Sequence, residues 1–458
     1  MTVSSEEPQP SIAVLPFVNM SGDKEQEYFS DGLAEEIINA LTKIPGLQVI
    51  ARTSAFAFKG KQEDIRKIAE VLGVANILEG SVRKSGNRIR VTAQLIEAFK
   101  GIHLWSERYD RDLTDVFEIQ DEIAAAIVGT LRIKLSTKLV PRHHEPNLAA
   151  HEAYLKARHL FGRFNPDSIE QTKAFLEKAI SMDPQYALAH CGLADLYLFL
   201  GIGSLPANET MPIIREEARK ALSIDPSLPE AYALLGIVAA KYDYDWKEAE
   251  KQFSLAMAHE TVPPLVRQWY AYFYLMHVGR TEECILQHEQ GIKGDPLNVI
   301  GRSTFAVSLL AAGRIADAHS EAMKVLEIDE AKESSFLNFS FIYARQKNWK
   351  ETLYNAEEAS RVVPWTKAIA AAALRKMGEE NRAEEVIQNL MHTDKSFIPI
   401  GLAIYHSICD ETEKATKWWE KAIEQRHSLV GQMIRIFFRS NPEWPAMAKL
   451  MNLPGEAL

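Results

Sequence analysis

The sequence has few cysteines, and none stands in a metal-site or disulfide spacing. The 458 residues contain only three, and they are far apart: Cys191, Cys284 and Cys409. Without a C-x-x-C pair, neither a zinc site nor a disulfide framework is expected. Two of the three occupy helix positions expected to be apolar, where a free thiol packs as a small hydrophobe. We therefore expect no metal and no cofactor.

Long apolar runs and an excess of positive charge are also missing. No stretch approaches 18 consecutive apolar residues, and the polar, acidic Met1–Pro10 does not resemble a signal peptide. The net charge of −10 disfavours binding to nucleic acid or to an anionic bilayer. We expect no direct nucleic-acid contact, no membrane insertion and a cytoplasmic location. A periplasmic location would follow if the chain were a fragment of a membrane-anchored protein.

Catalytic motifs are absent as well. The sequence contains no G-x-S-x-G, no H-E-x-x-H and no P-loop. The segment Gly201-Ile202-Gly203 lacks the third glycine and the preceding strand of a dinucleotide site. We expect a protein that is not an enzyme.

A repeat of 34 residues is the strongest positive signal. Turn residues recur at Gly279, Gly313 and Lys347, each 34 positions after the last. Two further sets keep this step, namely Cys284, Ala318 and Thr352, then Pro296, Glu330 and Pro364. The step is the length of a tetratricopeptide (TPR) helix–turn–helix unit, and such units stack into a solenoid with a concave surface.

The same pattern extends in both directions from this regular centre. Small residues at two fixed positions let neighbouring helices approach, and large apolar residues fill the space between them. About eight degenerate units fit between residues 148 and 430, which resembles the TPR family. Residues 431–458 differ from the repeats, and we expect them to form a capping helix at the end of a right-handed α-solenoid.

A different pattern precedes the repeats, from residue 11 to residue 137, and a linker is expected over 138–147. Short apolar runs alternate with amphipathic helical segments, and Asn76–Lys84 and Arg88–Glu97 flank a Ser-Gly-Asn turn. This order predicts a small α/β domain with a mixed sheet and a β-hairpin. The overall fold class is therefore α/β plus all-α.

Several segments of this region are similar to the TolB amino-terminal-like domain. They are Ile12–Phe17 with Asn19, Tyr28–Leu33, Val49–Ser54, Leu78–Arg83, Leu104–Asp110 and Ile119–Ile123. The resemblance implies a three-layer αβα sandwich that precedes TPR repeats in bacterial signalling proteins. In such proteins an adenylate cyclase, a CadC-like winged-helix domain or a kinase often lies upstream. Only ten residues precede the first strand here, so the resemblance implies a sensory or docking half without its effector.

The repeat register places an apolar stripe on the concave face. Its residues are Trp269, Phe273, Met276, Ser303, Val307, Leu310, Leu337 and Phe341. A stripe of this kind suits an amphipathic helix or another apolar segment of a protein partner. Two alternatives are open. In the first, the stripe is covered by the chain's own α/β domain or, in a homodimer, by a second copy. In the second, the repeat register is shifted by a position, and these side chains belong to the ordinary core between helices.

One loop of the first domain is a candidate ligand site. Asn19, Ser21 and Gly22 follow a strand, and Asp31 lies near the start of the next helix. A loop that leads into a helix N-terminus is able to hold an anion, although turn formation and capping explain the same residues.

These observations favour a non-catalytic scaffold or sensory module that binds a protein or peptide partner. The alternative is the regulatory half of an adenylate cyclase or DNA-binding regulator whose effector lies outside the chain. A small-ligand receptor is a third, weaker hypothesis.

Overall fold

The structure is a computed structural model. It describes residues 9–131, 133, 144–161, 166–203, 205–328, 333–392 and 397–455. Residues 138–143 of the expected linker lie outside these ranges.

The first part of the chain is built on a mixed sheet, as predicted. Its order is β3-β1-β4-β5-β6, with β2 beside β4. β1 runs parallel to β3 and β4, whereas β4, β5 and β6 form an antiparallel meander. The strands are β1 (Ser11–Val14), β2 (Val18–Asn19), β3 (Gln48–Val49), β4 (Asn76–Ser85), β5 (Arg88–Glu97) and β6 (Ile102–Asp112).

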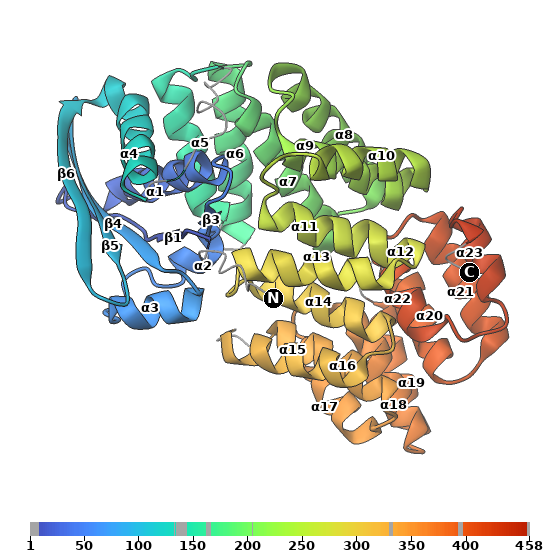
Figure 1. The fold of residues 1–458 in the computed structure, drawn as a ribbon. Coiled ribbons are helices and arrows are strands. Elements are labelled where there is room, and N and C mark those ends of the chain that lie inside the picture. Colours follow the sequence, from blue (N-terminus) through green and yellow to red (C-terminus); the bar gives the residue numbers. More distant parts are fainter. Residues whose placement is uncertain are drawn as a thin grey trace, which may run out of the picture.

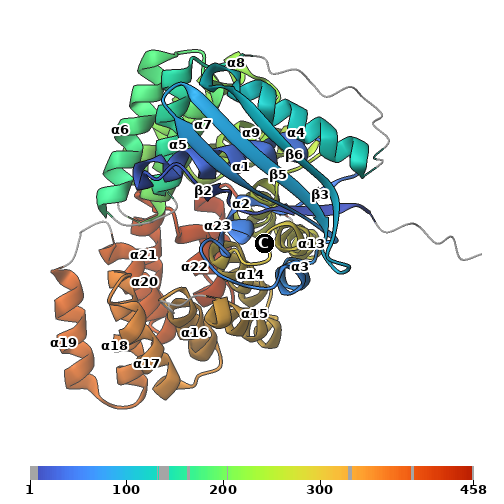
Figure 2. The same ribbon diagram turned by 90° about the vertical axis from the view of Figure 1, so that its left-hand side faces the viewer.

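Two helical layers enclose part of this sheet. α1 (Glu27–Thr42) and α4 (Val116–Thr130) cover one face, where the buried alternate residues of β5 lie. α2 (Arg52–Phe56) and α3 (Ile65–Leu72) cover the other face near β1 and the start of β4. The predicted three-layer arrangement is thus confirmed there. Strands β5 and β6 lie at the front of the molecule in Figure 2. Short turns η1 (Lys24–Gln26) and η2 (Leu113–Asp115) precede α1 and α4.

Eight helix pairs follow within the described residues and form the TPR-like array (Figure 1). The first helices of the pairs are α5 (Leu148–Phe161), α7 (Ala187–Gly203), α9 (Pro229–Val238) with η3 (Ala239–Asp243), α11 (Pro264–Tyr270) with η4 (Ala271–Leu275) and α12 (Met276–Val278), α14 (Val299–Ala311), α16 (Glu333–Arg345), η5 (Pro364–Thr366) with α18 (Lys367–Lys376), and α20 (Ile398–Ile408). The second helices are α6 (Pro166–Met182), α8 (Ala207–Ile224), α10 (Trp246–Met257), α13 (Thr281–Gly294), α15 (Ile315–Ile328), α17 (Trp349–Ala359), α19 (Glu380–Met391) and α21 (Thr412–Glu424). No helix in the described ranges combines the length and apolar character needed to span a bilayer.

The recurring turn residues share one backbone conformation. Gly279, Gly313 and Lys347 have φ values of 80°, 81° and 58°. Each ends the first helix of a pair in the left-handed region, which reverses the chain before the second helix. Gly378 (85°) and Asp410 (61°) do the same in the next two pairs. The 34-residue step therefore marks these turns, as the sequence predicts.

Replacing Lys347 by glycine should stabilise the array. A non-glycine residue in the left-handed region costs about 1–2 kcal/mol, and part of that gain is lost to the greater freedom of glycine in the unfolded chain. We expect a net increase of about 0.5 kcal/mol in the free energy of unfolding, measured by urea denaturation. Gly313→Ala, one repeat earlier, is the matched control and should destabilise by about 1 kcal/mol. Equal effects of both variants would contradict this reasoning.

The α/β part packs against the array at two separate places. Near its start, Glu35 on α1 pairs with Arg158 on α5 at 2.7 Å. Far along the chain, Ser54 Oγ donates to Asp295 Oδ1 at 2.5 Å, and Ala51 N donates to the Gly294 carbonyl at 2.9 Å. The α/β part therefore bridges the first and the fourth helix pairs through α1 and α2 (Figure 1).

Two helices follow the eighth pair, α22 (Val430–Phe437) and α23 (Trp444–Leu450). α23 packs on α21 at the end of the array, as a terminal cap does.

Candidate functional site on the concave face

The concave face consists of the first helices of successive pairs. From α9 to α20 each first helix contacts the next. Two of these helices contain π turns, η3 in the third pair and η4 in the fourth. π turns inside helices often occur at functional sites. The third and fourth helix pairs, which contain them, are therefore candidates for a functional role.

The residues of the predicted stripe lie in one apolar cluster. Five of them are buried: Phe273, Met276, Val307, Leu310 and Phe341. Trp269 and Leu337 are partly buried and pack on the same cluster. The hydroxyl of Ser303 accepts a hydrogen bond from Asn338 Nδ2 at 2.9 Å, which links the fifth pair to the sixth. The structure thus brings the stripe together, and its binding role stays a prediction.

Helix α22 covers part of this stripe. It contacts α12, α14, α16 and α20, which are parts of first helices, and also the second helix α21. The ring of Phe437 meets Phe341 edge-on, with centroids 5.9 Å apart, and Arg345 donates to the Ile436 carbonyl at 2.8 Å. The covering segment is therefore the chain's own C-terminal part. The sequence-based alternatives named the α/β domain or a second copy instead.

A buried polar cluster lies where α22 meets the third and fourth pairs. Lys241 Nζ donates to Gln432 Oε1 at 2.8 Å and lies 3.2 Å from His277 Nε2. Arg435 on α22 donates to the backbone carbonyl of His277. Lys241, His277, Gln432 and Arg435 are each at most 4% exposed. A buried cationic cluster of this kind is unusual, because buried charges normally have a partner of opposite charge.

Burial dominates the electrostatics of this cluster. It lowers the pKa of Lys241 to about 7 and that of Arg435 to about 9. Burial, together with the charges of Lys241 and Arg435, holds the pKa of His277 well below its usual range. Within the described ranges no hydrogen bond or ion pair joins a carboxylate to Lys241 or Arg435, although the Arg435 guanidinium lies 5.4 Å from the centre of the Trp444 ring. The closed arrangement therefore keeps positive charge in an apolar place without a negative partner, which costs stability.

Further contacts tie the C-terminal segment to the third pair. Trp246 Nε1 donates to the Met451 carbonyl at 2.8 Å. The guanidinium of Arg426 lies 4.0 Å from the centre of the Tyr244 ring, in a cation–π geometry. The array thus curves until its end meets its third helix pair.

The four residues of the predicted ligand loop lie in two segments, and ligand binding by them stays a prediction. Asn19 Oδ1 accepts from Ser21 N at 2.9 Å, within the turn that contains Gly22. Asp31 lies on α1 and pairs with Lys59 at 2.6 Å and with His159 at 2.8 Å. Burial alone would raise the pKa of Asp31, but these two partners lower it. Asp31 therefore takes part in the contact between α1 and α5.

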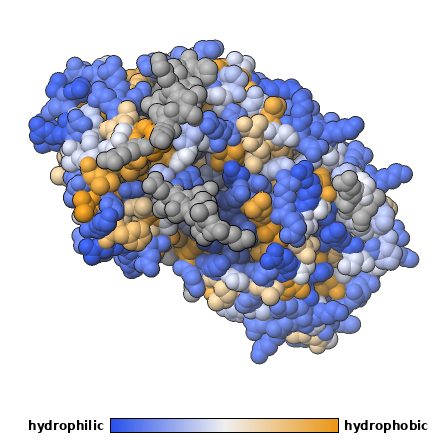
Figure 3. Space-filling view, viewed as in Figure 1, coloured by the Kyte–Doolittle hydropathy of each residue, from blue (hydrophilic) through white to orange (hydrophobic). Residues whose placement is uncertain are grey.

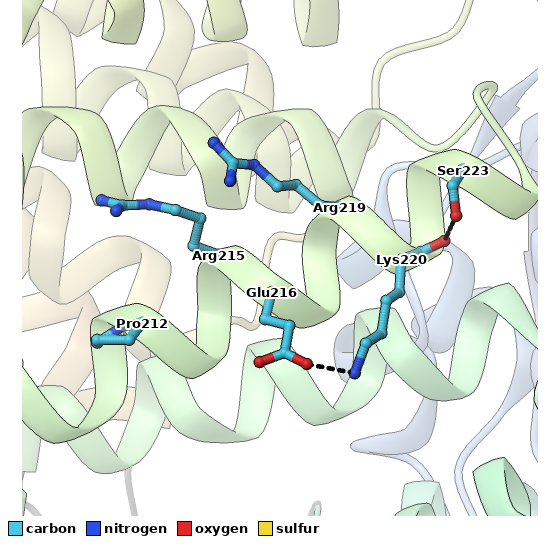
Figure 4. A pocket seen from close by; sticks show the side chains of 6 residues that line it. All are labelled: Pro212, Arg215, Glu216, Arg219, Lys220 and Ser223. Atoms are coloured by element: carbon cyan, nitrogen blue, oxygen red, sulfur yellow. Dashed lines mark hydrogen bonds and ion pairs between the residues drawn. The ribbon is translucent and has the colours of Figure 1, made fainter.

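A shallow depression of about 430 Å³ lies on the outer side of α8. All its lining residues come from this one helix: Pro212, Arg215, Glu216, Arg219, Lys220 and Ser223. Figure 4 shows Glu216 paired with Lys220, while the two arginines point away from that pair. The side chains do not converge on a point, so the depression does not have the polar arrangement of a ligand site.

Groups able to bind a metal do not gather in the part of the chain that the structure describes. No cluster of three or more His, Cys, Asp or Glu side chains occurs there. The cysteines are unpaired, and burial raises the pKa of each thiol.

Sequence reasoning missed the Lys241 cluster, although a signal was present. Lys241 follows the apolar run Ile237–Ala240, and His277 follows Leu275-Met276 in the next pair. Both lie shortly before the turn of a helix pair, at Tyr244 and Gly279. A polar residue near the end of each of two successive apolar helices indicates a buried polar contact between the two repeats. The partner, Gln432, is 191 positions from Lys241, and no repeat pattern reaches it.

Comparison with known sequences links the chain to bacterial regulators. Residues 8–126 match the family described as "HilA/YgeH-like transcriptional regulator, second domain". A protein named "Putative adenylate cyclase 3" from Rhizobium meliloti is 44% identical over 236 residues, which cover 50% of this chain and 40% of that protein. The transcriptional regulator HilA of Salmonella typhimurium is 23% identical over 305 residues, which cover 65% of this chain and 53% of that protein.

Among solved structures, the TPR protein YrrB is 21% identical, over 41% of this chain and 92% of that one, with a TM-score of 0.28. The chain spans only about half the length of the curated relatives it matches. It resembles bacterial signalling proteins in which an α/β domain precedes TPR repeats.

Proposed function

We propose that the chain is a non-catalytic protein-interaction module of a bacterial signalling system. In this proposal a helical segment of a partner protein binds the concave face in place of α22. The observation that carries it is the contact between α22 and the stripe, because the stripe already accommodates an amphipathic helix. The buried cations Lys241 and Arg435, which have no carboxylate partner within the described residues, further favour exchange, since they weaken the closed arrangement.

The same charges favour a partner helix that carries a carboxylate. Lys241 donates to the neutral side-chain oxygen of Gln432, and a charged acceptor makes a hydrogen bond roughly twice as strong. An acidic residue at the position equivalent to Gln432 would also compensate the buried cation. The proposed partner is therefore an amphipathic helix with an acidic residue on its apolar side.

A peptide supplied in trans tests the proposal. The receptor is the full chain with Gly431→Ala, which is expected to weaken the docking of its own α22 by about 2 kcal/mol, and the probe is a labelled peptide of residues 428–440. We expect the peptide to bind this variant roughly thirtyfold more tightly than the wild-type chain, as measured by fluorescence anisotropy. A Gln432→Glu peptide should bind about tenfold more tightly, because its carboxylate would pair with Lys241.

The control peptide carries Ile434→Glu and should not bind, because Ile434 is fully buried in the contact. If hydrogen exchange shows α22 released and no peptide binds, the concave face does not accept a helix from another molecule.

The relatives favour a second candidate function, in which this module regulates an output domain outside the chain. Two of them are named as a cyclase and as a transcriptional regulator, and the matches cover about half of each. Sequencing the transcript upstream of the first codon tests this hypothesis. An in-frame cyclase or winged-helix segment would support it, and an in-frame stop codon directly upstream would contradict it.

A further inference from the structure

Strand β6 forms one margin of the sheet and is long for an edge strand. It spans 11 residues, and within the described ranges it pairs only with β5. An edge strand exposes a row of unpaired backbone N–H and C=O groups, which are able to pair with another strand. Figure 1 places β6 at the outer left of the molecule, on the far side of the sheet from the array.

The side chains of β6 are largely exposed to solvent. Near its start, Ile102 is 50% and Leu104 39% exposed. Figure 3 shows hydrophobic side chains over the lower part of this sheet, above α3. Proteins usually protect such edges with short strands, charged side chains, proline or β-bulges. β6 has no proline, its pairing with β5 shifts register between Leu95 and Ile96, and its charges alternate in sign.

This alternation makes the strand complementary to itself. When two copies of β6 run antiparallel about a two-fold axis at Tyr109, position i faces position 218 − i of the other copy. Glu107 then faces Arg111 of the second copy, on the face of the sheet that carries Tyr109. On the opposite face, Arg108 meets Asp110 of the second copy. By symmetry each pair forms twice, and opposite charges directly across a strand pair stabilise it.

Other registers lack this match. An axis at Glu107, Arg108 or Asp110 would set that residue against its own copy, which places like charges opposite each other. An axis nearer the start of β6 would set Arg108 against Ile102 or Leu104. The contacts within one chain are compatible with the Tyr109 register: Asp110 holds the two arginines of β5 at 2.7 and 2.8 Å, from the side away from the free edge.

We propose that two copies of this chain associate through β6, in antiparallel register centred on Tyr109, and form one continuous sheet across the dimer. An isologous two-fold contact uses the same surface of both copies and leaves none of it free, so it yields a dimer and does not extend into a larger assembly. This inference is independent of what occupies the concave face.

Reversing one charge and then restoring the pair tests the interface. By size-exclusion chromatography with light scattering, the 51.6 kDa chain should elute as a dimer. Glu107→Arg sets arginine against Arg111 of the other copy and should weaken dimerisation at least tenfold. The swap Glu107→Arg/Arg111→Glu should restore it. Within one chain the swap removes the ion pair of Arg111 with Glu122 on α4 at 3.8 Å, in which both side chains are half-exposed, and the hydrogen bond from the Tyr109 hydroxyl to Glu107 at 3.3 Å. We expect these losses to cost the fold about 1–2 kcal/mol, so circular dichroism is needed to show that the swap variant is folded.

Glu118→Arg, an exposed position on α4, is the control of equal charge change and should remain dimeric. A wild-type chain that is monomeric at 100 µM would overturn the proposal. So would a Glu107→Arg variant that stays dimeric, or a folded swap variant that does not recover.

Disulfide trapping tests the register separately. Ser106 and Asp112 face each other across the proposed interface, whereas within one strand they are too far apart to be bridged. Under mild oxidation Ser106→Cys/Asp112→Cys should yield a covalent dimer in high proportion. Arg108→Cys/Asp112→Cys, which is out of register, should yield little. Equal yields from both variants would refute the Tyr109 register.

Discussion

Replacing Gly431 by alanine is expected to weaken the contact of α22 with the concave face. A β-carbon at this position would lie 2.5 Å from His277 Cδ2 and 3.1 Å from Lys241 Nζ. The imidazole ring of His277 is buried and has little room to move away. Overpacking of this kind costs about 1–3 kcal/mol. At an uncrowded position inside a helix, replacing glycine by alanine normally raises the free energy of unfolding. Here we expect the substitution to lower it.

Hydrogen exchange of residues 430–437 measures this effect directly. A cost of about 2 kcal/mol corresponds to roughly thirtyfold faster exchange of the α22 amides. The matched control is Gly129→Ala on α4, where a β-carbon would meet nothing within 4 Å. That change should stabilise α4 by about 0.5–1 kcal/mol, the usual gain of alanine over glycine. Unchanged exchange of α22 in Gly431→Ala would show that the close approach to His277 is not limiting.

Replacing Lys241 by methionine is expected to alter how stability depends on pH. The pKa of Lys241 is about 7 in the folded chain and about 10.4 in the unfolded chain. Because the folded pKa is lower, the protonated lysine destabilises the fold, fully below pH 7 and progressively less as the pH rises toward 10. The wild-type chain should therefore gain up to about 4 kcal/mol from this residue between pH 7 and pH 10.

Methionine has a similar length and no charge, so the Lys241→Met variant should lack this gain. The measurement is the free energy of urea unfolding for both proteins at several pH values. The difference in unfolding free energy between wild type and Lys241→Met should change by up to about 4 kcal/mol between pH 7 and pH 10. His277 stays neutral throughout, and Arg435 is common to both proteins. Lys247→Met, an exposed change on α10, should track the wild type. Parallel curves for wild type and Lys241→Met would contradict the prediction.

The repeat array and the α/β domain were predictable because local sequence determines them. The turns at Gly279, Gly313 and Lys347 each need a left-handed residue at a fixed interval, and that requirement is visible as a period. The alternation of Ile89, Val91, Ala93 and Leu95 likewise predicts a strand with one buried face. The composition of the stripe from Trp269 to Phe341 also follows from the repeat register.

What covers the stripe did not follow from the sequence. α22 is eight residues long and reaches helices far back in the chain, as the 191 positions between Lys241 and Gln432 show. The contact of Ser54 with Asp295 spans 241 positions. Such contacts depend on how far each repeat rotates relative to the last. Small rotations add up over the array, and no single residue encodes their sum.

The two attachments of the sheet to the array have a mechanical consequence. The contacts at Arg158 and at Asp295 hold the first and the fourth helix pairs to the same α/β part. The arc formed by the first four pairs is therefore fixed at both of its ends. The helix pairs beyond residue 297 lie outside this arc, and α22 joins them back to it through α12 and the third pair. A change of superhelical pitch in these later pairs would therefore strain or break the contacts of the C-terminal segment with the third and fourth pairs.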